Sequence, residues 1–448
     1  MLRIYNTATR KLEEFKPLGD VVKIYTCGPT VYSQAHIGNL TAYIYWDLLV
    51  RALKADNLRV KRVLNLTDVG HLVSDGDEGE DKLEKGAARE GKTVWEVADF
   101  YIAKFMKDYR DLGLLEPEVL SRATDYIDED IQAVDLMTEH GFTYETRDGV
   151  YYDTSKFEKY ADFARLDLSG LQAGARVEFS DEKRNASDFA VWKFIQPGEK
   201  HAMRWDYLGR PGYPGWHLEC ATIIHKELDE PIDIHTGGID HIPVHHTNEI
   251  AECFAAYGQK LSHYWMHCNF ITIDGEKISK SLGNTYSLDD LAERGFTPMD
   301  YKMWVLSGHY SGTRNFTFES LEAAKQRRLN WRNRIAECYQ KDVAFDDDAI
   351  EKILAAVDNN LNSPEAFAVI DGANLSLDQW HKVDELFGLR LVEDTPVIAE
   401  ELTALISERE AARKEKKFAR ADEIRDELAR HSIVVNDTAN GPIWQYIV

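Results

Sequence analysis

The stretch PVHHTNEIAECF, residues 243–254, contains side chains that are able to bind a metal ion. If it forms a helix, His245 and Glu249 lie one turn apart on the same face, because residues four apart stack above one another. His246 is then expected to point elsewhere. Imidazole and carboxylate groups both bind zinc, which usually takes four ligands in a tetrahedron. Two further ligands would have to come from other parts of the chain.

Two cysteines are candidates for the missing ligands. Cys27 follows an apolar run that predicts a strand, and Cys220 lies in PGWHLECATIIHKEL, a second α/β segment. Side chains near the ends of the strands of one parallel sheet can meet at its carboxyl edge. The candidate zinc ligands are therefore Cys27, Cys220, His245 and Glu249.

A simpler interpretation of these residues stays open. The chain has no CxxC pair, a lone buried cysteine often acts only as a small apolar side chain, and HHTNE can be the polar start of a helix. The order HHxxE also differs from the HExxH of zinc proteases, so peptide hydrolysis is not indicated.

A candidate phosphate site lies at His36-Ile37-Gly38-Asn39, where a loop enters a predicted helix. Free backbone N–H groups and the helix dipole favour an anion at such a helix start. Gly38 would let a base or a phosphate approach the backbone closely. His36 and Asn39 can both donate hydrogen bonds to it.

The loop KISKS, residues 277–281, is a second candidate phosphate site between Gly275 and Gly283. Folded over a triphosphate, it would place Lys277 and Lys280 on the outer oxygens. Either motif alone is common, and lysine–serine loops are usually just solvated. Both motifs in this order, with α/β sequence between them, indicate a nucleotide site.

The elements around the first motif predict a βαβ unit. Residues 21–32 begin as an apolar strand that breaks at Gly28-Pro29, residues 35–53 have a helical period, and residues 59–71 form a second strand. This is the unit of a parallel sheet, whose ligands collect at the carboxyl ends of its strands. Further on, residues 116–134 are expected to be helical.

The bulk composition restricts the class of protein. A chain of 448 residues is too long for one hydrophobic core, and its net charge of −24 argues against non-specific binding of nucleic acid. Two basic stretches, residues 325–334 and 409–420, could still hold a polyanion along one face, or could simply be solvated helix faces.

The same composition indicates where the protein works. Five scattered cysteines do not suggest a disulfide scaffold. No apolar run approaches the ~20 residues that cross a bilayer, and the first residues lack the apolar core of a signal peptide. We expect a cytoplasmic protein with no membrane partner.

The chain resembles the class I aminoacyl-tRNA synthetases, and among them the cysteinyl-tRNA synthetases. The resemblance runs nearly from end to end. It rests on LRIYNTATRKLEEFKP, YTCGPTVY ahead of HIGN, NLTDVG, LQAGARVEFSDEKRNASDFAVWK, GRPGYPGWHLEC, DIHTGG, HHTNEIA, YWMHCNFI, KISKSLGN, SGHYSG and ARKEKKFARADEIRDEL. Several of these stretches belong to the cysteine enzymes rather than to the class at large.

The resemblance implies an α/β fold: a Rossmann-type parallel-sheet catalytic domain with an insertion, an α-helical bundle and a small C-terminal α/β anticodon-binding domain. The expected ranges are 1–115 and 201–262 for the two halves of the catalytic domain, 116–200 for the connective insertion, 263–315 for a stem-contact region with the KISKS loop, 316–395 for the helical bundle and 396–448 for the C-terminal domain.

The resemblance also implies a reaction. Cysteine and ATP, with Mg²⁺, would give cysteinyl-adenylate, and the cysteinyl group would then pass to the 3′ end of tRNA(Cys). The family's zinc ligands fall on the same four residues that were proposed above from their chemistry. One Zn²⁺ per chain would select the thiol, and a monomer is favoured.

The remaining implied roles concern ATP and the amino acid. His36, Asn39, Lys277 and Lys280 would be catalytic, with Gly38 and Lys280 binding ATP. The implied amino-acid pocket comprises Gly28, Thr67, Trp216, His235 and Asp240.

The family pattern is not matched everywhere. Asn39 replaces the second histidine of the usual HIGH motif, so it can donate a hydrogen bond but cannot carry a positive charge. Ile278 stands where methionine is common, and Thr247 where glutamate is common. Two alternatives therefore remain: a ligase that passes cysteine to an amino-sugar without tRNA, and a non-catalytic RNA-binding paralogue.

Overall fold

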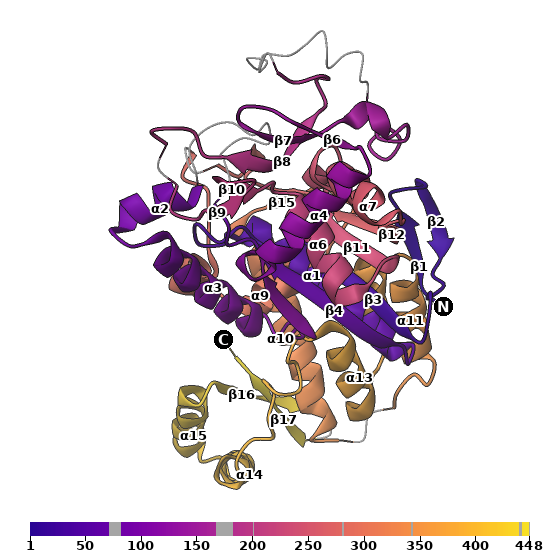
Figure 1. Cartoon of the computed structure of the whole chain (residues 1–448). Helices are drawn as coiled ribbons and strands as arrows, with labels where there is room; N and C mark the ends of the chain where they lie inside the picture. Colours follow the sequence, from indigo (N-terminus) through magenta and orange to yellow (C-terminus); the bar gives the residue numbers. More distant parts are fainter. Residues whose placement is uncertain are drawn as a thin grey trace.

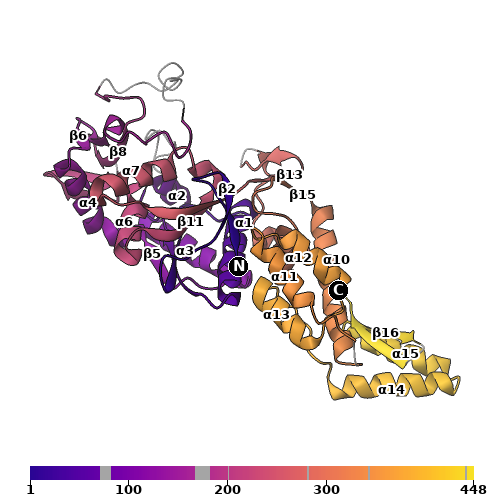
Figure 2. The ribbon, with the colours of Figure 1, turned by 90° about the vertical axis from the view of Figure 1, so that its right-hand side faces the viewer.

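The computed structural model describes residues 1–70, 82–166, 182–199, 201–279, 282–341, 344–438 and 441–447. Lys280 of the predicted nucleotide loop lies outside the described residues. Figure 1 shows a larger α/β body above a small C-terminal unit. In Figure 2 a group of helices joins the two, so the molecule is elongated.

A five-stranded parallel sheet forms the centre of the α/β body, in the order β12-β11-β3-β4-β5. Its strands are β3 (Val21–Thr26), β4 (Arg59–Leu66), β5 (Val119–Arg122), β11 (Ile232–Gly238) and β12 (Ser262–Cys268). β11 is buried over almost its whole length, as expected of a parallel strand that is covered on both faces. The connections run in opposite directions from β3 and β11, and such a switch point is where open α/β sheets bind ligands.

Strand β5 corrects the expectation of a helix over residues 116–134. Val119–Arg122 pairs in parallel with β4, and helical structure begins only with a 3-10 turn at Ala123–Tyr126 and with α4 (Ile127–Glu139). A sheet edge offers unpaired backbone groups, and pairing with them outweighs local helix preference. The domain boundaries expected from the sequence stay predictions.

Helices cover both faces of the central sheet. On one face lie α1 (Ile37–Ala55) and α9 (Pro298–Leu306), and on the other lie α6 (Leu218–Leu228) and α7 (His245–Tyr257). After β4 come α2 (Lys82–Glu90) and α3 (Val94–Asp111). The two predicted metal-binding segments, on α6 and α7, therefore share one face of the sheet.

The inserted segment contributes to a second, antiparallel sheet in the order β6-β7-β8-β10-β9. Its strands are β6 (Thr143–Glu145), β7 (Gly149–Tyr152), β8 (Phe189–Phe194), β9 (Trp205–Tyr207) and β10 (Arg210–Pro214), with a 3-10 turn at Thr154–Lys156. Thr222 on α6 donates a hydrogen bond to Asp130 on α4 at 2.6 Å, and the Tyr160 hydroxyl donates to Asn248 on α7 at 2.6 Å. The insertion thus braces both helices that carry predicted metal ligands.

Short strands complete the α/β body. β1 (Arg3–Asn6) and β2 (Lys11–Glu14) form a hairpin, and β13 (Ile271–Ile273), β14 (Glu276–Lys277) and β15 (Arg314–Phe316) form a small sheet. A 3-10 turn (Ile239–His241) precedes α7, and α8 (Leu288–Glu293) follows the KISKS region. β14 places the start of that motif on a strand.

The remaining elements form the helical region and the C-terminal unit. They are α10 (Phe318–Cys338), α11 (Ala349–Asp358), α12 (Ser363–Gly372), α13 (Leu377–Phe387), α14 (Glu400–Lys414), α15 (Phe418–Arg430), β16 (Ile433–Thr438) and β17 (Gly441–Tyr446). Trp331, Phe367 and Trp380 pack together in the helical core. The terminal hairpin docks on α10 through Gln340, whose amide donates to the Trp444 carbonyl at 2.9 Å.

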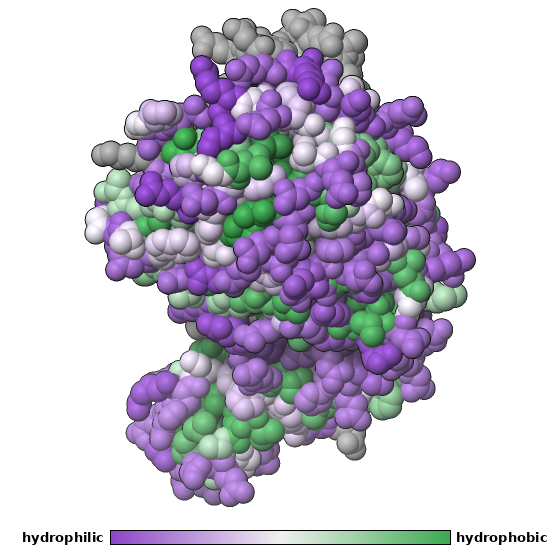
Figure 3. Space-filling model, viewed as in Figure 1, coloured by the Kyte–Doolittle hydropathy of each residue, from purple (hydrophilic) through white to green (hydrophobic). Residues whose placement is uncertain are grey.

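The molecular surface is mostly polar. Figure 3 shows a largely hydrophilic face with separate apolar patches. Among the described residues, no helix is both long enough and apolar enough to span a bilayer.

Candidate metal centre and nucleotide site

The carboxyl ends of β3, β4 and β11 lie close together at the switch point of the sheet. The Cys27 N–H donates to the Thr236 carbonyl at 3.1 Å, and the Gly28 N–H donates to Asn65 Oδ1 at 2.6 Å. A Cβ on Gly28 would lie 1.5 Å from the Asn65 carbonyl oxygen, so only glycine allows this approach. Cys27 is thereby held at the edge of the sheet beside β11.

The four predicted zinc ligands meet at this edge. One donor atom from each of Cys27, Cys220, His245 and Glu249 lies within 4.8 Å of the other three, and all four residues are buried. His245 Nε2 lies 3.5 Å from Cys220 Sγ and 3.0 Å from Glu249 Oε1. Zinc bonds of the usual length in a tetrahedron separate ligand atoms by about 3.3–3.8 Å. The donor types and their spacing fit a zinc ion.

The carboxylate of Glu249 gives a second reason to expect a cation. Its Oε2 accepts a hydrogen bond from His235 Nε2 at 2.7 Å, while its Oε1 is buried without a hydrogen bond. A buried acceptor without a partner is costly, and a metal ion would remove that cost. The free oxygen is the one that faces His245.

The expectation that His246 points away from the cluster is wrong. Its Nε2 lies 3.4 Å from Cys27 Sγ and 3.9 Å from Glu249 Oε1. Residues three apart also share a helix face, and this spacing brings His246 to Glu249. A second group of donors, Cys27, His235, His246 and Glu249, therefore overlaps the first.

Burial controls the protonation of the cluster. It raises the pKa of the Glu249 carboxyl well above its ordinary value, and burial beside Cys27 and Glu249 does the same for the pKa of the Cys220 thiol. Burial lowers the pKa of His235 to about 3, so this imidazole is neutral and donates to Glu249. Without a cation Glu249 and Cys220 resist ionisation, and a bound divalent ion would reverse that preference.

The predicted amino-acid pocket residues surround the cluster at different depths. The half-buried Trp216 ring lies 4.4 Å from the His245 ring, and Asn65 donates to the buried Thr67 hydroxyl at 3.1 Å. His235 is fully buried below the cluster. Asp240 is exposed in the turn before α7.

Other histidines near the cluster were not identified from the sequence. His267 on β12 and His241 in the turn before α7 both lie against His246, with ring centres at 4.9 and 5.1 Å. A Cβ on Gly237 would lie 2.6 Å from the His246 ring, so this glycine makes room for it. The signal that was available is the density of histidines between residues 235 and 267.

The HIGN motif lies at the start of α1, as predicted. His36 is the N-cap: its Nδ1 accepts from the Asn39 N–H at 3.3 Å, and Asn39 Oδ1 accepts from the His36 N–H at 3.2 Å. This reciprocal pair is a capping box. Asn39 therefore holds the helix start with its carbonyl oxygen, and its amide N–H groups stay available to an anion.

The KISKS segment lies directly over this helix start. A Cβ on Gly38 would lie 2.5 Å from Ile278 Cδ1, so the two motifs are in contact. The Asn284 amide donates to the Lys277 carbonyl at 3.1 Å and accepts from the Ser279 N–H at 2.8 Å, which braces the loop. Lys277 is exposed on β14. The two predicted phosphate-binding motifs thus lie side by side.

The basic stretch at residues 325–334 is neither a free polyanion surface nor a solvated face. Arg328 pairs with Asp394, Arg332 and Arg334 donate to backbone carbonyls, and Arg327 pairs with Asp371. In the stretch 409–420, Arg409 and Arg413 both pair with Asp437. Most of these cations join elements of the protein itself.

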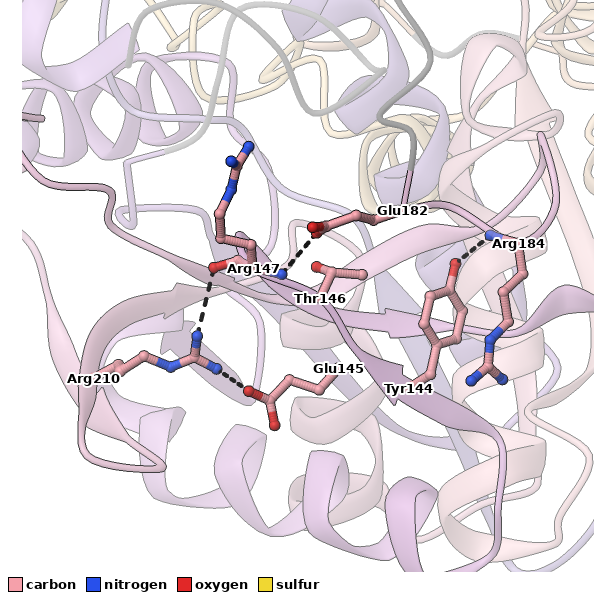
Figure 4. A pocket seen from close by; sticks show the side chains of 7 residues that line it. All are labelled: Tyr144, Glu145, Thr146, Arg147, Glu182, Arg184 and Arg210. Atoms are coloured by element: carbon pink, nitrogen blue, oxygen red, sulfur yellow. Dashed lines mark hydrogen bonds and ion pairs between the residues drawn. The ribbon is translucent and has the colours of Figure 1, made fainter.

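A polar hollow of about 550 Å³ opens on the inserted sheet (Figure 4). It is lined by Tyr144, Glu145, Thr146, Arg147, Glu182, Arg184 and Arg210. Arg210 pairs with Glu145, and Arg184 pairs with Asp153 at 3.3 Å. The residues that line this hollow do not include the buried donors that meet at the carboxyl edge of the central sheet.

Comparisons with known proteins identify the family of the chain. A family model described as the tRNA synthetases class I (C) catalytic domain matches residues 14–326, and a cysteinyl-tRNA ligase anticodon binding domain matches residues 395–444. The chain is 43% identical to cysteine–tRNA ligase 1 of Burkholderia lata, covering 98% of this chain and 96% of that protein. It is 37% identical to cysteine–tRNA ligase of Treponema denticola, covering 99% of both.

Solved structures share the fold. The methionyl-tRNA synthetase of Mycobacterium tuberculosis, in complex with methionyl-adenylate, superposes with a TM-score of 0.58 at 14% identity, covering 88% of this chain and 84% of that one. A putative arginyl-tRNA synthetase from Campylobacter jejuni gives 0.52 at 11% identity, covering 84% and 91%. With the two family models and the full-length relatives, this places the chain in the cysteine–tRNA ligase family of class I tRNA synthetases.

Proposed function

We propose that this protein activates L-cysteine with ATP and transfers the cysteinyl group to the 3′ end of tRNA(Cys), and that it selects cysteine with one zinc ion. The observation that supports the zinc most strongly is the convergence of four buried donor residues at the switch point of the sheet. The reaction is proposed from the names of the related proteins, and the means of selecting cysteine is proposed from the chemistry of the four donor residues.

Cys27, Cys220, His245 and Glu249 would hold the zinc. When bound, zinc supplies a Lewis acid that favours a soft sulfur ligand over a hydroxyl. Four protein ligands normally close a zinc site, so the substrate must add to the set or loosen one member. Glu249 is the candidate to loosen, because His235 can keep holding its other oxygen.

Binding of the substrate sulfur to zinc would separate cysteine from serine, which is similar in size. Serine differs from cysteine by one atom, and shape alone separates groups of such similar volume poorly. A ten-thousandfold preference corresponds to roughly 5.5 kcal/mol between the two complexes. Trp216, Thr67, Gly28, His235 and Asp240 would form the pocket around the substrate's amino-acid group.

The first step needs positioning and charge stabilisation rather than covalent help from the protein. The start of α1, with His36 and Asn39, would bind the phosphates of ATP, and Gly38 would bring the backbone of this helix start close to Ile278 of the lysine loop. Lys277 and Lys280 would stabilise the departing pyrophosphate. ATP is expected to arrive with Mg²⁺.

The second step needs tRNA bound across the length of the molecule. The C-terminal unit would bind the anticodon, since residues 395–444 match that family model. A monomer working in the cytoplasm is the form that we propose.

Two assays test the proposal. Cysteine-dependent exchange of pyrophosphate into ATP measures activation, and attachment of cysteine to tRNA measures transfer. A ligase that uses an amino-sugar would pass only the first assay, and a non-catalytic RNA-binding paralogue would pass neither.

A matched pair of cysteine variants tests the metal. Cys220→Ser should lose zinc and lower kcat/KM for cysteine by roughly 100-fold or more, because it removes a proposed ligand. Cys338→Ser, on α10 outside the cluster, should keep the zinc ion and the wild-type kcat/KM for cysteine. Zinc-free protein with full preference for cysteine over serine would contradict the proposal.

A further inference from the structure

Three buried polar side chains form an unbroken line from the metal cluster to the N-terminal segment. His246 Nε2 lies 3.4 Å from Cys27 Sγ, its Nδ1 lies 2.7 Å from His267 Nε2, and His267 Nδ1 lies 2.7 Å from the Thr7 hydroxyl. All of these residues are less than a tenth exposed. Nothing in the proposed reaction uses His267 or Thr7.

A neutral imidazole carries one N–H and one lone-pair nitrogen, so the line allows two proton orders. In the first, the Thr7 hydroxyl donates to His267, His267 Nε2–H donates to His246 Nδ1, and His246 Nε2–H faces the Cys27 sulfur. In the second, every hydrogen bond is reversed. His246 Nε2 then presents a lone pair and becomes a possible metal ligand.

The two orders are not equal, because of the Thr7 hydroxyl. In the reversed order it accepts from His267, and its own proton needs another acceptor. Among the described residues, His267 is the only hydrogen-bond partner of this buried hydroxyl. Burying a donor without a partner is costly, so the first order is favoured.

We propose that Thr7 is a positioning residue that fixes this proton order, so that His246 donates its N–H to the Cys27 sulfur and stays out of the zinc ligand set. The inference rests on the proposed function. It explains how the protein chooses between two overlapping donor groups that share Cys27 and Glu249. An N–H donor to a ligand sulfur also tunes the metal, as groups behind metal ligands commonly do.

The direct test is the tautomer of both histidines in the zinc-loaded wild-type protein. Nitrogen NMR of ¹⁵N-histidine-labelled protein should show the proton on Nε2 of both His246 and His267. Signals are assigned by their loss in His246→Gln and His267→Gln. A proton on Nδ1 of either ring, or a metal-bound His246, overturns the proposal.

A second test uses cobalt(II) in place of zinc, because thiolate-to-cobalt absorption reports the number of sulfur ligands. The favoured group has two cysteines and the overlapping group has one. Thr7→Val removes the hydroxyl at nearly constant volume, so absorption per cobalt should fall from the two-thiolate toward the one-thiolate level. Thr7→Ser should restore it.

Identical cobalt spectra for wild type and Thr7→Val would overturn the role of Thr7. That failure is distinguishable from failure of the proposed function, because activation of cysteine and charging of tRNA by the wild-type protein would be unaffected.

Discussion

Two glycines show how single residues shape the proposed site. Gly237 lies under the His246 ring, and Gly38 lies under the Ile278 side chain. In both places a methyl group would meet a neighbouring side chain at less than 3 Å. Each contact leads to a measurable prediction. Gly19→Ala is the control for the first, because its added Cβ would have no neighbour within 4 Å.

We expect Gly237→Ala to weaken zinc binding by roughly 10- to 100-fold, because it displaces a side chain that supports the ligands. Competition with a chromophoric chelator measures the affinity. Gly19→Ala should match wild type. Wild-type affinity in Gly237→Ala would show that His246 has no influence on the metal.

We expect Gly38→Ala to raise KM for ATP by about tenfold, equivalent to about 1.4 kcal/mol, because it pushes Ile278 and the lysine loop away from the helix start. Pyrophosphate exchange at varied ATP measures it. In an Ile278→Ala background the added methyl has more room, so the same change should cost less. Equal effects in both backgrounds would contradict contact between the motifs.

The sequence predicted the four metal-binding residues, and the structure brings them together, although their role stays a proposal. It did not predict the place of His246, because the four-residue spacing pairs His245 with Glu249, whereas His246 reaches the same carboxylate through the three-residue spacing. Nor did it predict that Asn39 would cap its own helix. The contact between His246 and His267 depends on the position of β12 beside α7, which no local sequence pattern predicts.

At the scale of elements, polar contacts to Asp289 join α8 to α3 and to the segment ahead of α1. Lys104 on α3 pairs with Asp289 on α8 at 2.9 Å, and Gln34 ahead of α1 donates to the same carboxylate at 3.3 Å. Asp108 lies buried beside them. Burial, together with the charge of Asp289, raises the pKa of Asp108 to about 6 from its ordinary 3.8.

This raised pKa predicts a pH-dependent stability. The folded protein binds a proton on Asp108 that the unfolded chain releases between about pH 4 and 6, so this group destabilises the fold as pH rises through that window. Asp108→Asn should therefore add up to about 3 kcal/mol at pH 8 and almost nothing near pH 4. Urea unfolding at both pH values measures the difference.

Asp99→Asn, on an exposed position of the same helix, is the control. It should show no comparable gain at pH 8. A gain in Asp108→Asn that is the same at both pH values would contradict the assignment to an ionised carboxylate.

A second prediction concerns the buried pair between α1 and α9. Lys302 Nζ lies 3.1 Å from Asp47 Oδ2, and both side chains are fully buried. Lys302→Met leaves Asp47 with Arg51 as its charged partner and should cost about 3–5 kcal/mol in the free energy of unfolding. Lys352→Met, which breaks an exposed pair with Asp348, should change stability little. Similar losses in both variants would contradict the importance of burial.

Local sequence pattern predicted β3, α1 and β4. It failed at β5, since residues 119–122 become a strand only by pairing with β4. Likewise, the sequence predicts a polyanion surface or a solvated face for the arginines of α10, because their acceptors, such as Asp394 and the Ala373 carbonyl, lie far away in the sequence. In both cases the structure is determined by contacts with residues that are distant in the sequence and that the fold brings together.

At the scale of the whole molecule, the C-terminal unit lies apart from the sheet edge that we propose for activation. Figures 1 and 2 show the inserted sheet at one end and the C-terminal unit at the other, with the helical region between them. The separation predicts that the two partial activities can be lost independently.

Removing residues 397–448 should lower kcat/KM for tRNA by about 100-fold or more, equivalent to about 2.7 kcal/mol, while cysteine-dependent pyrophosphate exchange stays within a few fold. The comparison of both assays on one protein measures this. Circular dichroism controls for folding, because the deletion uncovers Ala336 on α10. Unchanged tRNA charging would contradict a role of the C-terminal unit in binding tRNA.

The most direct test of the account is X-ray absorption at the zinc edge of the purified protein, with and without substrate. Two sulfur neighbours are predicted for the protein alone, from Cys27 and Cys220. Three are predicted with cysteine and two with serine. A sulfur count that stays at two when cysteine is bound would contradict selection of the substrate thiol by the metal.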